Sequence, residues 1–188
     1  TKMVRQDPEP KILTTVHDFP IAAFGTATTL AGGTSITVNA FTNQFNNEQC
    51  TFYGYAVDVM ALDANGNQLT VETDTSPYFY QPQAAAGTST TGTFTDFDVN
   101  FFVGGNTIPS DDIGTQRLLL PKTMHQQRYI AFPSPILVLY QQPLQVMVQN
   151  NVAIAGHRMT SAGAPSDVRT VRVKITLIGQ NEIQKRIA

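Results

Sequence analysis

The residues best suited to chemistry are few in this sequence and lie far apart. Its three histidines, His17, His125 and His157, have no ligand partners at the spacing typical of a metal site. The first and the last are each followed by a charged residue. We expect both of these pairs to lie in loops, because nothing in the sequence would orient either ring as a catalytic base. The single cysteine, Cys50, opens a predicted strand and is expected to pack as a small core side chain.

Two carboxylates, Asp96 and Asp98, share one face of a predicted strand, which places their side chains about 7 Å apart. That spacing suits the acid and base of an inverting glycosidase. Carboxylates on an exposed strand face are, however, typical of a solvated surface, and the chain has no tryptophan to form a sugar platform. We therefore predict no catalytic residue, no metal ligand and no cofactor, and we do not expect an enzyme.

The segment LDANGNQL allows two interpretations. Asn65 and Gly66 between two strand-like runs form a strong hairpin signal. Alternatively, Asp63, Asn65 and Asn67 could occupy the first, third and fifth positions of a calcium loop. The sixth position of such a loop needs glycine, but Gln68 stands there, and no glutamate follows at the twelfth position. The hairpin is the favoured interpretation.

Alternation of apolar and polar residues recurs along the whole chain, whereas sustained helical periodicity does not. The run VRTVRVKITLI at residues 168–178 places its apolar side chains on one face, with Arg172 and Lys174 on the other. Residues 77–92 and 152–167 are predicted loops, and residues 110–115 could form one helical turn. The predicted strands cover residues 12–16, 20–24, 35–41, 50–62, 68–73, 93–103, 136–140, 144–149 and 168–178.

This pattern of about eight to ten strands with unequal loops predicts an all-β protein, an antiparallel β-sandwich of the jelly-roll type. We expect a single domain with extended terminal arms. Residues 1–11, which contain two prolines, form the N-terminal arm, residues 12–179 the sandwich and residues 180–188 a polar C-terminal tail. The first eleven residues carry charge without an apolar run after them, so we expect no signal peptide and synthesis in a reducing cytoplasm.

The most apolar stretch, RYIAFPSPILVLYQQPLQVMVQNN at residues 128–151, raises the question of a membrane segment. Its most apolar part, residues 129–140, is broken by two prolines and is only about half the roughly 20 residues that a spanning helix needs. Pro133 and Pro135 cannot donate to a central ladder, so they predict an irregular or edge segment that leads into a strand. A membrane span is excluded, and a strand pair of the sandwich is predicted instead.

Charge is scarce and unevenly distributed. Only 14% of the residues are charged, against about 25% in typical soluble domains. Such a surface is expected where neighbouring subunits cover it, although a merely neutral β-protein would also fit. Residues 12–116 contain ten acids and no lysine or arginine, whereas residues 117–188 contain nine bases and two acids. This asymmetry either orients subunits against one another or cancels within one sheet.

Nucleic-acid binding has little support. Arg169, Arg172 and Lys174 form a basic stripe that Lys185 and Arg186 extend. The sequence pI is nevertheless near 5.8, while dedicated duplex-binding domains lie above about 9. We expect no specific nucleic-acid readout.

Taken together, the proline-containing arm, the jelly-roll strand pattern, the charge-poor surface and the short polar tail resemble viral capsid proteins. The stretch RYIAFPSPILVLYQQPLQVMVQNN, followed by VRTVRVKITLIG, is similar in style to the closing strands of bacteriophage jelly-roll structural proteins. The resemblance covers most of the chain as an overall pattern, without a signature motif. It implies a virion component, a capsid, minor capsid or cement subunit, that assembles with copies of itself and other virion proteins through lateral contacts and swapped arms.

We therefore consider three functions. The first is a virion structural subunit, and the second is a carbohydrate-binding or adhesin-type module, such as a receptor-binding component of a phage, with a glycan as partner. The third, a cupin-type enzyme, is opposed by the number and spacing of the histidines. The hypothesis of a virion subunit assigns subunit contacts to Lys2, Arg5, Tyr78, Phe79, Tyr80, Arg169, Arg172, Lys174, Lys185 and Arg186.

Overall fold

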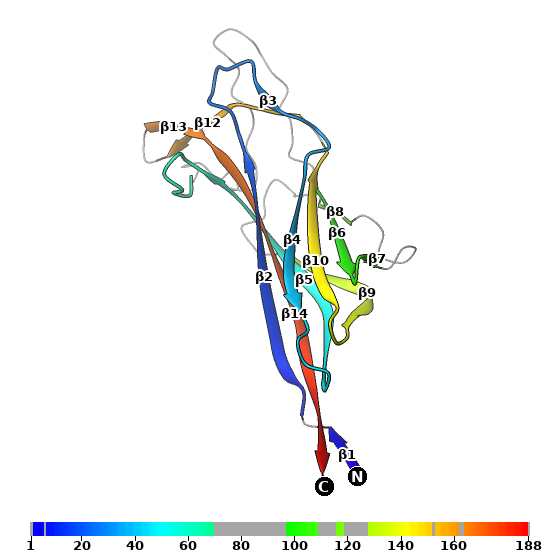
Figure 1. Cartoon of the computed structure of the whole chain (residues 1–188). Coiled ribbons are helices and arrows are strands. Elements are labelled where there is room, and N and C mark those ends of the chain that lie inside the picture. Colours follow the sequence, from blue (N-terminus) through cyan, green and yellow to red (C-terminus); the bar gives the residue numbers. More distant parts are fainter. Residues whose placement is uncertain are drawn as a thin grey trace.

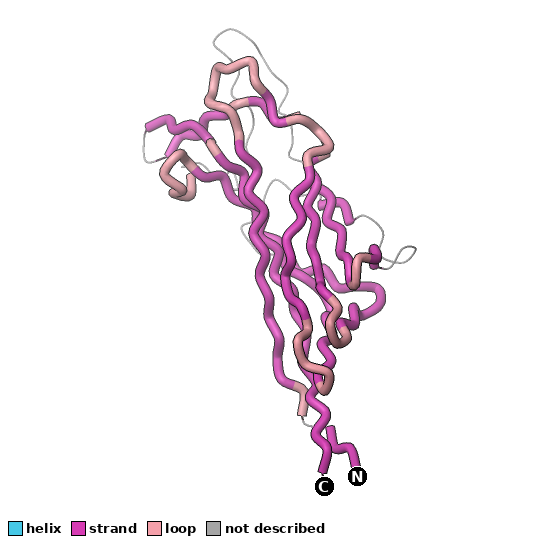
Figure 2. Tube along the Cα trace, viewed as in Figure 1, coloured by secondary structure: helices cyan, strands magenta, loops and turns pink. Residues whose placement is uncertain are grey.

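The computed structural model describes residues 2–5, 7–69, 97–108, 116–118, 128–151, 153–161 and 164–187. In these ranges the chain is all-β, built from two antiparallel sheets that face each other and narrow toward the end where both termini lie (Figure 1, Figure 2). No helix in the described ranges is long and apolar enough to cross a membrane. The predicted β-sandwich is confirmed.

Fourteen strands make up the described fold. They are β1 (Lys2–Arg5), β2 (Glu9–Pro20), β3 (Thr29–Leu30), β4 (Ser35–Thr42), β5 (Glu48–Leu62), β6 (Phe97–Val103), β7 (Asn106–Ile108), β8 (Gln116–Leu118), β9 (Arg128–Val138), β10 (Pro143–Asn150), β11 (Ile154–Ala155), β12 (His157–Ser161), β13 (Ala164–Val168) and β14 (Thr170–Ile187).

The pairing of the eight main strands defines the topology. In chain order these strands are β2, β4, β5, β6, β8, β9, β10 and β14. The first pairs with the eighth, the second with the seventh, the third with the sixth and the fourth with the fifth. Such nested pairing is that of a long antiparallel hairpin rolled up into two sheets, which is the jelly roll. The first sheet has the order β2-β14-β5-β9, and the second has the order β4-β10-β6 with β7 and β8 beside β6.

The core lies between the two sheets and follows the alternation seen in the sequence. Val171, Val173, Ile175 and Leu177 of β14 are all fully buried, and the residues between them face outward. Aromatic side chains fill the middle of the sandwich, where the ring of Phe101 from the second sheet and the rings of two neighbours from the first sheet lie 5.0–5.5 Å apart. The neighbours are Tyr55 and Phe132.

Several strand boundaries differ from those expected, and β9 covers residues 128–138 where a strand at 136–140 was predicted. The predicted strands 12–16 and 20–24 are replaced by the single strand β2, so His17 and Asp18 lie in a strand and not in a loop. The last strand does not end at Ile178 but continues to Ile187, because a β-bulge beside Gly179 keeps it paired with β5. A side chain at Gly179 would collide with the Thr51 carbonyl, so this position requires glycine.

The predicted loop 152–167 was also wrong in part. It contains β11 and most of the hairpin β12–β13, in which His157 pairs with Val168. β11 has only two residues and the hairpin strands are largely polar, so without apolar alternation their pairing leaves no pattern in the sequence.

Other local predictions are confirmed. Pro133 and Pro135 lie in β9, the edge strand of the first sheet, where an irregularity in the pairing with β5 accommodates them. The turn at Asn65 and Gly66 reverses the chain so that Leu62 bridges to Gln68. The predicted strand 68–73 beyond residue 69, the loop 77–92 and the helical turn 110–115 lie outside the described residues.

The Asp63 carboxylate closes this turn. It accepts hydrogen bonds from the main-chain N–H groups of Asn65 and Asn67, each at 2.8 Å. These bonds hold the pKa of Asp63 below its usual value. Because the carboxylate is engaged in stabilising the turn, the hairpin accounts for this segment without a calcium ion.

Candidate assembly surface

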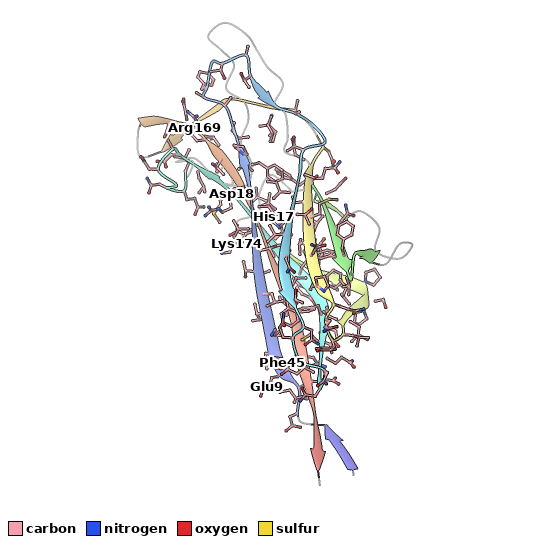
Figure 3. All side chains as sticks on the ribbon, in the orientation of Figure 1. Glu9, His17, Asp18, Phe45, Arg169 and Lys174 are labelled. Atoms are coloured by element: carbon pink, nitrogen blue, oxygen red, sulfur yellow. The ribbon has the colours of Figure 1, made fainter. Side chains whose placement is uncertain are left out.

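The outward face of the β2-β14-β5-β9 sheet, which we call the outer face, is divided into a charged half and an apolar half. In the charged half, the register partners of Arg172 in β14 are Asp18 in β2 and Met60 in β5. Two residues further along β14, the partners of Lys174 are Val16 and Asp58. Figure 3 labels Asp18, Lys174 and, nearer the β12–β13 end, Arg169. Acidic residues of β2 and β5 thus flank two bases of β14, so on this face part of the charge asymmetry of the sequence cancels within one sheet.

The strongest contact in the charged half is the ion pair between Arg172 and Asp18. The guanidinium donates through Nε to Oδ1 at 2.7 Å and through one terminal nitrogen to Oδ2 at 2.8 Å. This bidentate contact lowers the pKa of Asp18 and raises that of Arg172. Both side chains are more than one-third exposed, so the pair contributes little to stability. The ion pair nevertheless holds the Arg172 guanidinium against a residue of the same chain.

The apolar half begins four residues beyond Lys174 along β14, at Ile178. Ile12 and Ile178 are register partners on β2 and β14, and Ile12 is 65% exposed. Next to Ile178 comes Gly54 of β5, and the ring of Tyr129 lies over this glycine, within 2.5 Å of where a β-carbon would be. Tyr129 itself is 51% exposed, and Leu137 of β9 adds another exposed apolar side chain. We call Ile12, Ile178, Tyr129 and Leu137 the outer apolar patch.

The terminal segments form a second feature at the narrow end. β1 pairs with residues 184–187 of β14, whereas the pairing of β14 with β5 ends at Ile183. Beyond that residue β1 and β14 form a two-stranded ribbon, which extends past the sandwich in Figure 1. Within the described residues no third strand joins it. We call residues 2–5 with 184–187 the terminal ribbon.

The structure distributes the predicted contact residues over this surface. Lys2, Arg5, Lys185 and Arg186 all lie in the terminal ribbon. Arg172 and Lys174 lie toward the other end of β14, about 40 Å away along the strand, and Arg169 directly precedes that end. Tyr78, Phe79 and Tyr80 are outside the described residues. The basic residues therefore form two separate groups, and not one continuous stripe.

Sequence reasoning missed a buried histidine at the seam between the sheets. His17 has no exposed surface. Its Nδ1 lies 3.1 Å from the Ile36 carbonyl of β4 and must carry the proton, because a carbonyl only accepts. Its Nε2 then accepts from the Thr15 hydroxyl at 3.0 Å. Burial lowers the pKa of His17, so the ring is neutral at pH 7. The inward alternation of Thr15, His17 and Phe19 was the signal that could have placed it.

No catalytic arrangement emerges in the described part of the chain. His17 is used to join the sheets, and Cys50 is buried with its thiol directed to the Asn181 side-chain oxygen at 3.4 Å. Burial raises the pKa of this thiol, which disfavours the reactive thiolate. No three His, Cys, Asp or Glu side chains among the described residues converge on a metal-sized site. The predicted pair of Asp96 and Asp98 cannot be compared, because Asp96 lies outside those residues.

Comparisons with known proteins return only distant likenesses. No protein-family model and no curated protein matches the chain. Among solved structures, VP1 of the Trichodysplasia spinulosa-associated polyomavirus aligns over 92% of this chain and 96% of its own, at 8% identity and a TM-score of 0.26. The same VP1 in complex with 6'-sialyllactose aligns over 96% of this chain and 95% of its own, at 9% identity and a TM-score of 0.25. At these scores the jelly-roll assignment depends on the strand pairing alone.

Proposed function

We propose that this chain is a non-enzymatic structural subunit of a virion, either a capsid, a minor capsid or a cement protein. In this proposal it is made in the host cytoplasm and resides in the virion, where it contacts copies of itself and other virion proteins. The sandwich acts as a rigid block, while the outer face and the terminal ribbon make the contacts. The bacteriophage origin implied by the sequence resemblance belongs to the same proposal.

The outer apolar patch is the single observation on which the proposal depends most. Large apolar side chains that adjoin one another on an exposed sheet face are typical of a surface that another protein covers. Gly54 leaves the Tyr129 ring room to lie against the sheet, which makes the patch flat. A flat apolar area bounded by a charged strip fits the flank of a neighbouring subunit better than it fits a small ligand.

The terminal ribbon supports the same proposal. A two-stranded ribbon is only marginally stable in water by itself, and among the described residues no further strand pairs with this one. Its outward edges also leave main-chain N–H and C=O groups available to a further strand, a known route for one chain to recruit another. A neighbouring subunit that adds a strand here would stabilise the ribbon and tie the two subunits together.

The charged half of the outer face would set the register. Arg172 is engaged by Asp18 in its own chain, so Arg169, which is exposed, and Lys174 are the bases available to acidic residues of a neighbour. Charges placed beside an apolar contact select orientation more than they add affinity. Occasional phosphate contact by these bases is compatible with the proposal, which includes no specific nucleic-acid readout.

A charge placed in the patch tests the proposal. Ile12→Lys should weaken self-association by at least about tenfold, because it buries an unpaired ammonium in the contact. Ala64→Lys, which adds the same charge at the exposed tip of the 63–67 turn, is the matched control and should assemble normally. Sedimentation velocity over a range of concentrations measures both. Equal association of the two variants would exclude the outer apolar patch as the contact.

Removal of residues 1–6 tests the terminal ribbon. This truncation leaves β2 and the whole sandwich in place, so the far-ultraviolet circular dichroism of the fold should persist while assembly is weakened. Loss of the β spectrum would instead show that the segment belongs to the folding core, and the assembly role of the ribbon would have to be abandoned.

A further inference from the structure

A pocket of about 260 Å³ opens at the narrow end of the sandwich. Four of its lining residues come from the β4–β5 connection and the start of β5, and two come from the β9–β10 turn. Figure 3 labels Phe45 on the first of these connections, near the end where the termini lie. The lining residues are Asn46, Asn47, Glu48, Gln49, Leu139 and Tyr140.

The two walls are fastened to each other by Asn43, which is fully buried. Its side-chain Nδ2 donates to the Glu48 carbonyl at 2.9 Å, and its Oδ1 accepts from the Phe45 N–H at 3.1 Å. Its main-chain carbonyl accepts from the Gln141 N–H at 2.8 Å, which joins the β9–β10 turn. Both walls are thus held in one arrangement before any ligand arrives, which lowers the entropic cost of binding.

The carboxylate at the pocket is also oriented. Glu48 Oε2 accepts from the Asn181 side-chain amide at 3.1 Å, and Asn181 is buried. This contact positions the carboxylate as a hydrogen-bond acceptor without neutralising its charge, because the amide partner is uncharged.

The lining combines amide groups with an exposed ring. Within the described part of the chain, the side-chain amides of Asn46, Asn47 and Gln49 form no hydrogen bond, so each has donors and an acceptor to offer. Tyr140 exposes nearly half of its side chain, and its hydroxyl is positioned by the Gln141 amide at 3.2 Å. Leu139 adds an apolar surface beside it.

The chemistry of this lining defines the class of ligand. No lysine, arginine or histidine lines the pocket, and the carboxylate repels anions, so phosphates and acidic sugars are disfavoured. A saccharide ring has an apolar face that can lie against Tyr140 and Leu139, and its hydroxyls can pair with amides and a carboxylate. An engineered cavity of about 150 Å³ already admits benzene, so one six-membered ring fits in this pocket. We propose that the pocket binds a neutral saccharide.

Two observations separate this site from the outer apolar patch. The lining residues belong to the connections at the end of the sandwich, whereas the outer apolar patch lies on the face of the sheet. In addition, none of the subunit contacts that were assigned from the sequence lines this pocket. Saccharide binding and self-association can therefore fail independently.

The test uses the full chain on an array of neutral oligosaccharides ending in galactose, glucose, mannose or N-acetylglucosamine, together with their sialylated counterparts. Binders are then titrated by saturation-transfer NMR. Asn47→Ala and Tyr140→Ala should each weaken binding by about tenfold or more, since each removes direct contacts. Gln44→Ala, an exposed residue of the same connection outside the lining, should bind as the unaltered chain does.

The outcomes decide the proposal. Binding of neutral glycans that is lost in Asn47→Ala and Tyr140→Ala but kept in Gln44→Ala establishes the site. Three results would overturn the proposal. They are no binding to any glycan on the array, a preference for the sialylated forms, and binding that both pocket variants retain. Circular dichroism of each variant confirms that the sandwich is intact, and all three positions are exposed, so folding should not be affected.

Discussion

Replacement of His17 by leucine should destabilise the sandwich more than its modest change in volume suggests. The ring joins β2 of the first sheet to β4 of the second, through the Ile36 carbonyl at 3.1 Å and the Thr15 hydroxyl at 3.0 Å. Leucine fills most of the space but pairs with neither group. Both groups would remain in the interior without a partner, and each such loss costs about 1–3 kcal/mol. We expect the free energy of unfolding to fall by about 2–6 kcal/mol.

A double-mutant cycle with Thr15→Val tests the assigned contact. Valine keeps the shape of threonine but removes the hydroxyl, so Thr15→Val alone should cost about 1–3 kcal/mol by leaving His17 Nε2 without a donor. In the double variant that nitrogen and that hydroxyl are both gone, and only the Ile36 carbonyl lacks its partner. The double variant should therefore lose only about 1–3 kcal/mol, which is less than the sum of the single variants by at least about 2 kcal/mol.

Urea unfolding at pH 7.5, followed by far-ultraviolet circular dichroism at one protein concentration, measures all four proteins. Circular dichroism is the appropriate probe because the chain contains no tryptophan. Additivity within about 0.5 kcal/mol would mean that the two side chains do not interact. A His17→Leu variant as stable as the unaltered chain would refute the role of the ring as a link between the sheets.

The same histidine predicts a pH dependence. Burial lowers its folded-state pKa below the usual value of 6.5, so the unfolded chain binds the proton more readily. The stability that the neutral ring provides is therefore complete above pH 6.5 and is lost progressively as the pH falls below it. Asp18 and Asp63 have lowered pKa values and act only in a more acidic range. From pH 7.5 to 5.5 the unaltered chain should lose stability, and His17→Leu should lose measurably less.

Two further predictions concern the outer face. Gly54→Ala should lower the melting temperature, because the new methyl group would lie 2.5 Å from both the Ile130 carbonyl and the Tyr129 hydroxyl. Each kcal/mol of stability lost should lower it by about 2–4 °C. An unchanged melting temperature would show that β9 can move away from the new methyl group. Asp18→Asn should cost only about 0.5 kcal/mol, since its partner Arg172 and Asp18 itself are both more than one-third exposed. This loss should disappear in 1 M salt, and a loss that persists there would mean that the pair acts through packing.

Much of the fold follows from alternation, because one inward residue in every two is a local property of a strand. The apolar runs of β10 and β14 therefore placed their inner faces correctly, and Pro133 with Pro135 marked an edge strand. Pairing that depends on the main chain has no such signature. The hairpin β12–β13, the hairpin β6–β7 after Gly105 and the extension of β14 past Gly179 all escaped for this reason.

The candidate surfaces were harder to predict than the fold. The basic residues were identified, but the sequence could not show that Asp18 of β2 pairs with Arg172, which lies 154 positions further along the chain. Ile12 was expected in a strand, yet its outward orientation is fixed only by its register with Ile178. The pocket is built from two connections that are distant in the sequence, and the polar side chains of one of them gave no pattern beyond that of a loop.

The most direct test of the central claim is the solution mass of the unaltered chain, measured by light scattering with negative-stain images of the same sample. A virion subunit that associates through the outer apolar patch should give closed oligomers or shells, with a mass that grows with concentration. A monomer at every concentration, with Ile12→Lys indistinguishable from the unaltered chain, would contradict self-assembly through this surface.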